Sequence, residues 1–156
     1  MQAMAKSVGG IVLFLLAAAL PLTLHADESL MKTLADSELV DILQSDGYRA
    51  VERVDERVIK IKIDGHTYAL YIYDDDDLQL YFGLTGYVLT NEHMNDWNRT
   101  KRLSRAYLDD ENYPVLEADL LANAGYTRKQ LMEWLSVFDS AAREFRQFLD
   151  ENDQGA

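Results

Sequence analysis

The sequence contains no cysteine. This absence excludes disulfide bridges, metal sites built on thiolates, cysteine nucleophiles and the lipid-modified cysteine that anchors lipoproteins. The domain must therefore draw its stability from a hydrophobic core. The material for such a core is present, because 48% of the residues are hydrophobic and apolar residues recur along the whole chain.

Basic residues are also scarce. The chain has 15 lysine and arginine residues against 27 aspartate and glutamate residues, which gives a formal net charge of −12 at pH 7. This charge repels phosphate groups and so argues against binding to nucleic acids or to anionic lipid surfaces. A basic or neutral protein partner, or a cation, suits the charge better, although an acidic surplus also serves simply to keep a protein soluble.

The first 26 residues have the organisation of a secretory signal peptide. Lys6 precedes an almost wholly apolar run from Val8 to Leu24, and Ala26 offers a small residue at the expected cleavage point. The alternative is an uncleaved membrane anchor, but the run falls short of about 20 uninterrupted apolar residues and contains Pro21. We expect cleavage after Ala26, no stable membrane anchor thereafter, and a location in the periplasm or outside the cell.

Residues 27–150 are expected to form one domain, followed by a frayed polar tail at 151–156. Apolar residues at helical spacing predict a first helix over 36–45, with Asp36 or Ser37 as its N-cap. Alternation with a period of two then predicts a meander of antiparallel strands. These strands lie at 51–54, 59–63, 66–73 and 78–82, and a tight turn at Asp64-Gly65 joins the second to the third.

The second half of the chain changes period again. A middle helix that carries Trp97 is predicted after Thr90 or Asn91, and strands at 105–108 and 115–120 flank an acidic turn as a second hairpin. A capping-box pattern at Thr127 and Gln130 opens a long last helix, which runs to about Leu149 and whose apolar stripe can cover the sheet. The expected fold class is therefore α+β, with an antiparallel sheet packed by an N-terminal, a middle and a long C-terminal helix.

Three segments stand out from this pattern. They read Asn-Asp-Trp-Asn at 95–98, Arg-Ala-Tyr-Leu-Asp at 105–109 and Val-Leu-Glu-Ala-Asp-Leu at 115–120. In these segments the chain resembles the YbjN family of bacterial sensory transduction regulators, and the resemblance extends over essentially all of residues 30–150. It implies an α+β fold similar to that of type III secretion chaperones, which bind partner proteins as homodimers. It implies no enzyme activity, and the predicted export signal argues against a cytoplasmic client.

The middle helix holds the first candidate site. Asn95 and Asn98 flank Trp97 and share one edge of the helix. Two amides beside an indole are suited to the rim of a site that binds a peptide or ligand, because amides donate and accept hydrogen bonds and the indole supplies contact area. The favoured alternative is structural: Trp97 belongs to the core, and the amides cap the ends of neighbouring strands.

The aromatic residues of the meander form the second candidate site. Tyr71 and Tyr73 alternate with Leu70 and Ile72, so they lie on the opposite face of their strand. If no helix covers this face, its aromatic side chains can bind a partner segment on the face or at the edge of the sheet. Coverage by helices, or burial in a homodimer, would remove that surface.

The remaining polar clusters point to no chemistry. Asp74–Asp77 and Asp109–Glu111 lack the spacing of a calcium loop, and paired carboxylates act as acid and base only where their surroundings separate their pKa values. His66 and His93 show no metal-binding spacing. We therefore assign no catalytic residue, no cofactor and no metal.

These observations lead to two hypotheses of different classes. The first is an exported, non-enzymatic protein-binding domain of YbjN type with a regulatory or chaperone-like role in the cell envelope. The alternative is a periplasmic small-ligand-binding protein or hydrolase that uses the clustered carboxylates, and a purely structural homodimer is a third option. A pocket that places one of these carboxylates beside Trp97 or His93 would favour the alternative, whereas a flat apolar surface favours the first hypothesis.

Overall fold

The computed structural model describes residues 29–155 of the chain. The signal peptide predicted for residues 1–26 lies outside this range and stays a prediction. None of the helices within the described range is long and apolar enough to cross a membrane.

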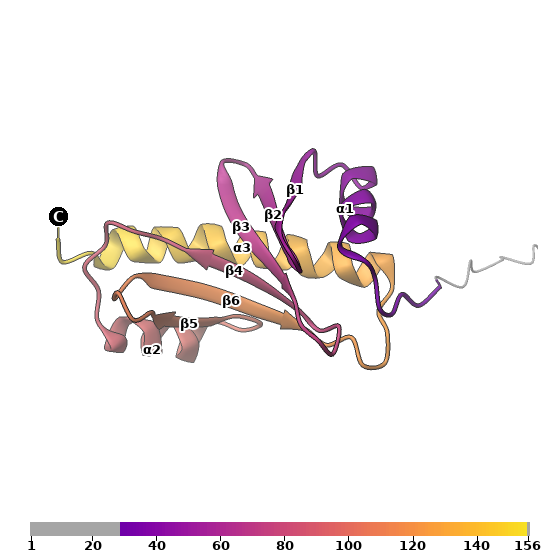
Figure 1. Cartoon of the computed structure of the whole chain (residues 1–156). Helices are drawn as coiled ribbons and strands as arrows, with labels where there is room; N and C mark the ends of the chain where they lie inside the picture. The colour runs from indigo at the N-terminus through magenta and orange to yellow at the C-terminus, as the bar shows by residue number, and fades with distance from the viewer. Residues whose placement is uncertain (1–28, 156) are drawn as a thin grey trace, which may run out of the picture.

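Three helices and six strands form the α+β fold that the sequence predicts (Figure 1). In chain order they are α1 (Asp36–Ser45), β1 (Ala50–Asp55), β2 (Val58–Ile63), β3 (His66–Ile72), β4 (Leu78–Gly83), α2 (Asn91–Thr100), β5 (Arg105–Leu108), β6 (Pro114–Leu120) and α3 (Arg128–Asn152). Thr90 and Thr127 are the N-caps of α2 and α3, and each hydroxyl accepts a hydrogen bond from a backbone N–H in the first turn. The further likeness to type III secretion chaperones stays a prediction.

The two ends of the domain differ from expectation. The N-cap of α1 is Ala35, because Asp36 is already helical and its carboxylate accepts hydrogen bonds from the Arg53 side chain and the Arg57 backbone N–H instead. At the other end α3 extends into the segment predicted as a frayed tail. The residue after α3, Asp153, accepts a hydrogen bond from the backbone N–H of Val88, so these residues are tied to the loop before α2.

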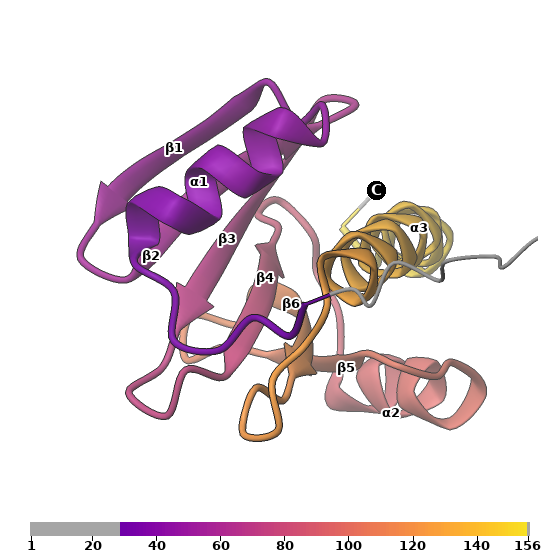
Figure 2. The same ribbon diagram turned by 90° about the vertical axis from the view of Figure 1, so that its right-hand side faces the viewer.

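The strands form one antiparallel sheet in the order β1-β2-β3-β4-β6-β5. Asp64 and Gly65 both have positive φ in the β2–β3 turn, as predicted for a primed hairpin turn. The sequence did not predict that β6 would pair with β4 along Val115–Leu120, which inserts β6 between β4 and β5. Figure 2 shows the resulting twisted sheet, with β1 and β5 at its two edges.

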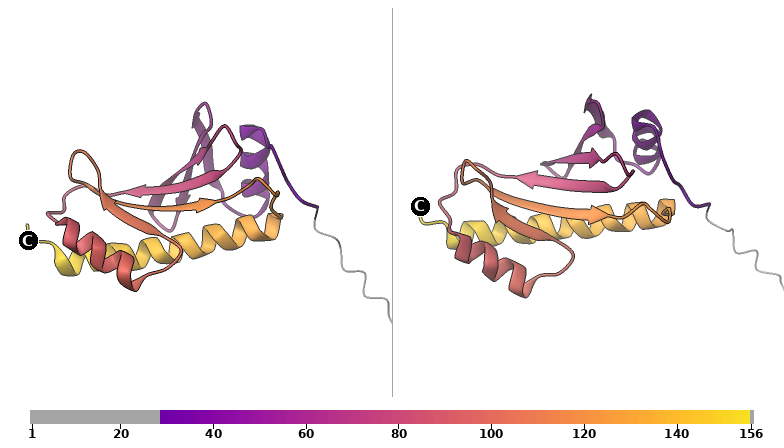
Figure 3. Two further views of the ribbon diagram at one scale, coloured as in Figure 1. Left: turned by 90° about the horizontal axis from the view of Figure 1, so that it is seen from below. Right: turned by 60° about the horizontal axis from the view of Figure 1, so that its bottom comes forward.

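All three helices pack on the same face of the sheet. One row across that face consists of direct cross-strand partners, and these are Ile59, Leu70, Leu80 and Ala118. They belong to one buried cluster with Leu39 of α1, Trp97 of α2 and Phe138 of α3. Figure 3 shows α3 running along the sheet with α2 beside its C-terminal half. The opposite face of the sheet is therefore left without a helix over it in residues 29–155.

Candidate functional site

The face of the sheet opposite the helices carries four tyrosines, which we call the tyrosine face. These are Tyr71 on β3, Tyr73 just after it, Tyr81 on β4 and Tyr107 on β5. Tyr71 points away from the buried Leu70 and Ile72, as the strand alternation predicted. Its ring meets that of Tyr81 edge to face, with centroids 6.1 Å apart. Tyr73 is 47% exposed, so it is the more accessible of the two tyrosines that the sequence predicts to bind a partner.

A buried glutamate lies among these tyrosines. Glu117 of β6 is only 5% exposed, and its carboxylate accepts a hydrogen bond from the Tyr107 hydroxyl at 2.6 Å and forms an ion pair with Arg105. Desolvation, the hydrogen bond to Glu117 and the charge of that carboxylate raise the pKa of Tyr107. The phenol is therefore a neutral donor at neutral pH, and the charge of Glu117 is balanced within the protein.

A second chain of hydrogen bonds fixes the exposed tyrosine. The Tyr73 hydroxyl donates to the Gln79 side-chain oxygen at 2.9 Å, and the Gln79 amide nitrogen donates to Asp119 at 2.8 Å. Desolvation is the main cause that raises the pKa of Tyr73, and the charges of Glu117 and Asp119 add to it. Two of the four tyrosines of this face, Tyr73 and Tyr107, are thus held in place by hydrogen bonds of their hydroxyl groups to neighbouring polar side chains.

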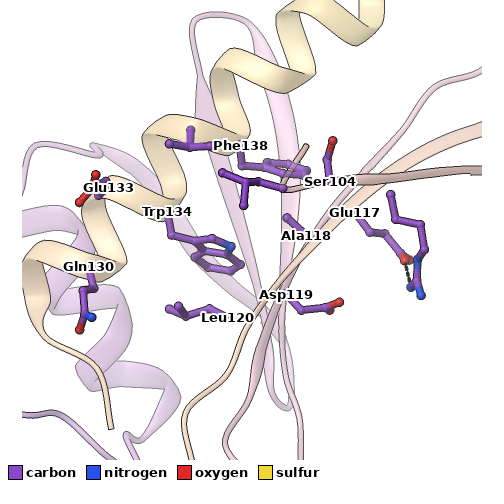
Figure 4. Close-up of a pocket in the computed structure, with 12 residues that line it drawn as sticks. Ser104, Glu117, Ala118, Asp119, Leu120, Gln130, Glu133, Trp134 and Phe138 are labelled. Atoms are coloured by element: carbon purple, nitrogen blue, oxygen red, sulfur yellow. Dashed lines mark hydrogen bonds and ion pairs between the residues drawn. The ribbon is translucent and has the colours of Figure 1, made fainter. Parts of the chain in front are cut away.

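A groove of about 510 Å³ lies next to this face, between α3 and the C-terminal end of β6 (Figure 4). Its apolar lining comes from Trp134, Val137 and Phe138 on α3, from Ala118 and Leu120 on β6, and from Leu103 just before β5. Figure 4 shows the indole of Trp134 lying between the helix and the strand.

The rims of the groove are polar. Gln130 and Glu133 lie on the α3 side, and Glu117 and Asp119 lie on the β6 side. Figure 4 shows Glu117 and Asp119 pointing away from α3, so their carboxylates belong to the tyrosine face as well. The groove and the tyrosine face are therefore two sides of the same stretch of β6.

The edge of β6 is open beside the groove because β5 is short. β5 begins at Arg105, which pairs with Glu117, so no residue of β5 lies opposite Ala118–Leu120. Leu103 has a left-handed backbone with φ 63° and is 71% exposed, which marks where the chain turns away from the ladder.

Two backbone hydrogen bonds show which groups of β6 face this opening. The C=O of Pro114 accepts from Leu84, after β4, and the C=O of Tyr113 accepts from Asp109, after β5. The backbone N–H and C=O groups of successive residues in a strand point alternately to its two sides. Every second residue counted from Tyr113 therefore has these groups on the β5 side, and Asp119 is one of them. Within residues 29–155 no backbone group pairs with Asp119 on that side.

The middle-helix candidates of the sequence analysis occupy two different environments. Trp97 is 1% exposed and packs against Phe145 and Phe148, with ring centroids 5.0 and 5.7 Å away. Asn98 caps β5, since its amide both donates to and accepts from the backbone of Ala106 at 2.8 Å. Asn95 is exposed. Trp97 and Asn98 therefore have the structural roles that were the favoured alternative.

The acidic clusters form hydrogen bonds to the backbone of loops, Asp109 within its own turn and Asp77 to the segment after β6. Asp77 accepts from the backbone N–H of Ala122, and Asp109 accepts from the backbone of Glu111 and Tyr113. Neither cluster lines the groove or a second depression of about 440 Å³ beside Trp97. Across residues 29–155 no group of three or more histidine, aspartate or glutamate side chains is arranged to hold a metal ion.

Sequence reasoning missed the groove, although two signals of it were present. The predicted arms of the second hairpin, 105–108 and 115–120, have unequal lengths, which leaves part of the longer arm without a partner. Val137 is an apolar residue outside the apolar stripe of the last helix and is 39% exposed. Nothing in the sequence pattern distinguished Glu117, because a charged residue on a strand is normally read as solvent-exposed.

The capping role of Asn98 can be measured. Asn98→Ala leaves the N–H and C=O of the buried Ala106 without their side-chain partner, so we expect the free energy of unfolding in urea to fall by about 1–3 kcal/mol. Asn95→Ala is the matched control on the same helix and should change this free energy by less than about 0.5 kcal/mol. Equal losses in the two variants would contradict the role given to Asn98.

Comparison with known families agrees with this architecture. The model of the YbjN family, described as "Putative bacterial sensory transduction regulator", matches residues 36–151. The matched span begins with α1 and ends in the last turn of α3, so it includes the tyrosine face and the groove. No curated protein matches the sequence. Because the family model covers most of the chain, the protein belongs to the YbjN family.

Proposed function

We propose that this protein is an exported, non-enzymatic protein-binding domain with a regulatory or chaperone-like role in the bacterial cell envelope. The family description supports a regulatory role and names no reaction. The observation that carries the proposal is the tyrosine face, which no helix of residues 29–155 covers and on which hydrogen bonds hold Tyr73 and Tyr107 in place.

The chemistry of this face suits a protein partner. Tyrosine is enriched at the energetically dominant positions of protein interfaces, because its ring buries apolar area and its hydroxyl hydrogen-bonds at the rim. Tyr73 and Tyr107 are already fixed through Gln79 and Glu117, so less side-chain freedom is lost on binding. The net charge of −12 attracts a basic partner and speeds its encounter.

The hydrolase alternative has weaker support. The carboxylates of Asp77 and Asp109 accept hydrogen bonds from loop backbone, and the acidic residues of the groove rim come from elsewhere in the chain. The depression beside Trp97 contains Glu144, whose carboxylate is paired with Lys101. Each of the three carboxylates of Asp77, Asp109 and Glu144 is thus engaged in a structural contact.

Export is proposed from the sequence of residues 1–26. Their basic start, apolar run and small residue before Asp27 are typical of a cleaved signal peptide. An exported regulator would meet its partner outside the cytoplasm, so the partner is expected among envelope or secreted proteins.

The tyrosine face can be tested with the double variant Tyr71→Ala and Tyr73→Ala. We express the full chain with a C-terminal tag, capture partners from envelope extract, and measure the affinity of each purified partner by titration. The double variant should bind at least about tenfold more weakly because aromatic anchors are lost. Tyr87→Ala, a tyrosine whose hydroxyl contacts α3, is the control and should bind as wild type. Unchanged affinity in a double variant that keeps its circular dichroism spectrum would refute the proposed binding surface.

Export can be tested separately by fractionation of cells that express the full chain. The protein should appear in the periplasmic fraction with Asp27 as its first residue by mass spectrometry. Leu15→Arg together with Leu16→Arg interrupts the apolar run and should retain the uncleaved protein in the cytoplasm. Leu30→Arg changes an exposed residue after the expected cleavage point, and this variant should still be exported and cleaved. Wild-type protein found uncleaved in the cytoplasm would be incompatible with the proposed location.

A further inference from the structure

We propose that the groove between α3 and β6 binds an extended segment of a partner protein, which pairs with the open edge of β6 and places a basic residue between two apolar ones. This inference rests on the proposed function, because it describes the segment that a protein partner would offer. It uses other residues than Tyr71 and Tyr73, however, so a failure of the groove inference can be told apart from a failure of the proposed function.

The backbone of the segment is recognised by Asp119. Asp119 has its N–H and C=O on the side where β5 has ended, and an added strand can take both hydrogen bonds there. An antiparallel segment satisfies both groups with a single residue, since directly opposed residues in such a pair exchange two hydrogen bonds. That central residue would stand where Leu103 would lie if β5 continued along β6.

Strand alternation then determines where the neighbouring side chains point. Ala118 and Leu120 face the helices, so the residues of the segment on either side of the central one also face α3. There they meet Trp134 and Val137 in the apolar part of the groove. Its volume of about 510 Å³ lies in the range of ligand pockets, and its exposed apolar lining favours medium-sized apolar side chains.

The central side chain lies on the tyrosine face beside Asp119. Glu117 is already paired with Arg105, whereas within residues 29–155 the Asp119 carboxylate accepts a hydrogen bond from the amide of Gln79 alone. Among residues 29–155 no lysine, arginine or histidine forms an ion pair with Asp119. A lysine or arginine in the segment complements this charge, whereas an acidic residue would be repelled.

The lining of the groove holds one further polar group. The indole N–H of Trp134 is buried and has no hydrogen-bond partner within residues 29–155. Buried donors without partners are rare in folded proteins. Because this nitrogen is closed to solvent, the indole must turn toward the groove before a carbonyl oxygen of a bound segment can accept its hydrogen bond.

The test uses a fluorescent peptide, Thr-Val-Arg-Val-Thr with blocked ends, titrated against protein purified after expression of the full chain. Saturable binding is expected. N-methylation of the arginine nitrogen removes one backbone donor, and exchange of arginine for glutamate reverses the charge, so each should weaken binding at least about tenfold. Cross-peaks of Asp119 and Leu120 in the NMR spectrum should shift on addition of the unmodified peptide.

The matched protein variants are Val137→Glu, in the groove, and Val54→Glu, on β1 at the other edge of the sheet. Both valines are exposed and both changes add one negative charge, but only Val137→Glu removes apolar lining from the groove. We expect at least about tenfold weaker peptide binding for Val137→Glu and less than about twofold change for Val54→Glu.

Several results would overturn the inference. These are the absence of saturable peptide binding, equal binding of the N-methylated peptide, or unchanged binding by Val137→Glu. Dissociation of a wild-type dimer by Val137→Glu would instead assign the groove to a second copy of the chain. If an envelope partner depends on Tyr71 and Tyr73 but not on Val137, the proposed function stands and the groove inference fails.

Discussion

One-sided burial of the sheet is the constraint on which the rest of the structure depends. Because α1, α2 and α3 all pack on one face, most buried apolar residues of the strands point to that face, and the other face must be stabilised by its own side chains. That face is stabilised by hydrogen bonds between polar side chains, such as those from Tyr107 to Glu117 and from Tyr73 to Gln79. A buried carboxylate is tolerated there because Arg105 and a phenol hydroxyl satisfy it. The same arrangement leaves aromatic rings in fixed positions at the surface, which is what a binding surface requires.

The second feature that shapes the molecule is the difference in length between β5 and β6. An open strand edge invites pairing with another chain, and proteins commonly keep such edges short. Here the opening is confined to the end of β6 and lies beside an apolar groove formed with α3. Leu103 and Val137 are exposed beside it, which is costly in a surface with no partner and useful in one that binds an apolar segment. The tyrosine face and the groove share β6, so a single partner can contact both.

Local patterns predicted the elements well because each has a local cause. Alternation of apolar and polar residues predicted the strands, and the capping-box pattern predicted the start of α3. The Asp64-Gly65 pair predicted the hairpin turn, in which both residues have positive φ. The pairing of β4 with β6 could not be predicted, since alternation specifies which face a strand buries and not which strand lies beside it. The burial of Glu117 and the groove depend on that pairing and were missed with it. The N-cap of α1 was misplaced because Asp36, a good capping residue, is used to bind Arg53 and Arg57 instead.

The most direct test of this account is hydrogen exchange at the amides of β6, measured by NMR on the protein without any partner. The Glu117 amide faces β5 and the Ala118 amide faces β4, so both are in the ladder and should exchange slowly. The Asp119 amide faces the opening, and it should exchange at least about tenfold faster than either neighbour. An Asp119 amide as protected as those of Glu117 and Ala118 would mean that this edge is already occupied, and the account of an open β6 would be wrong.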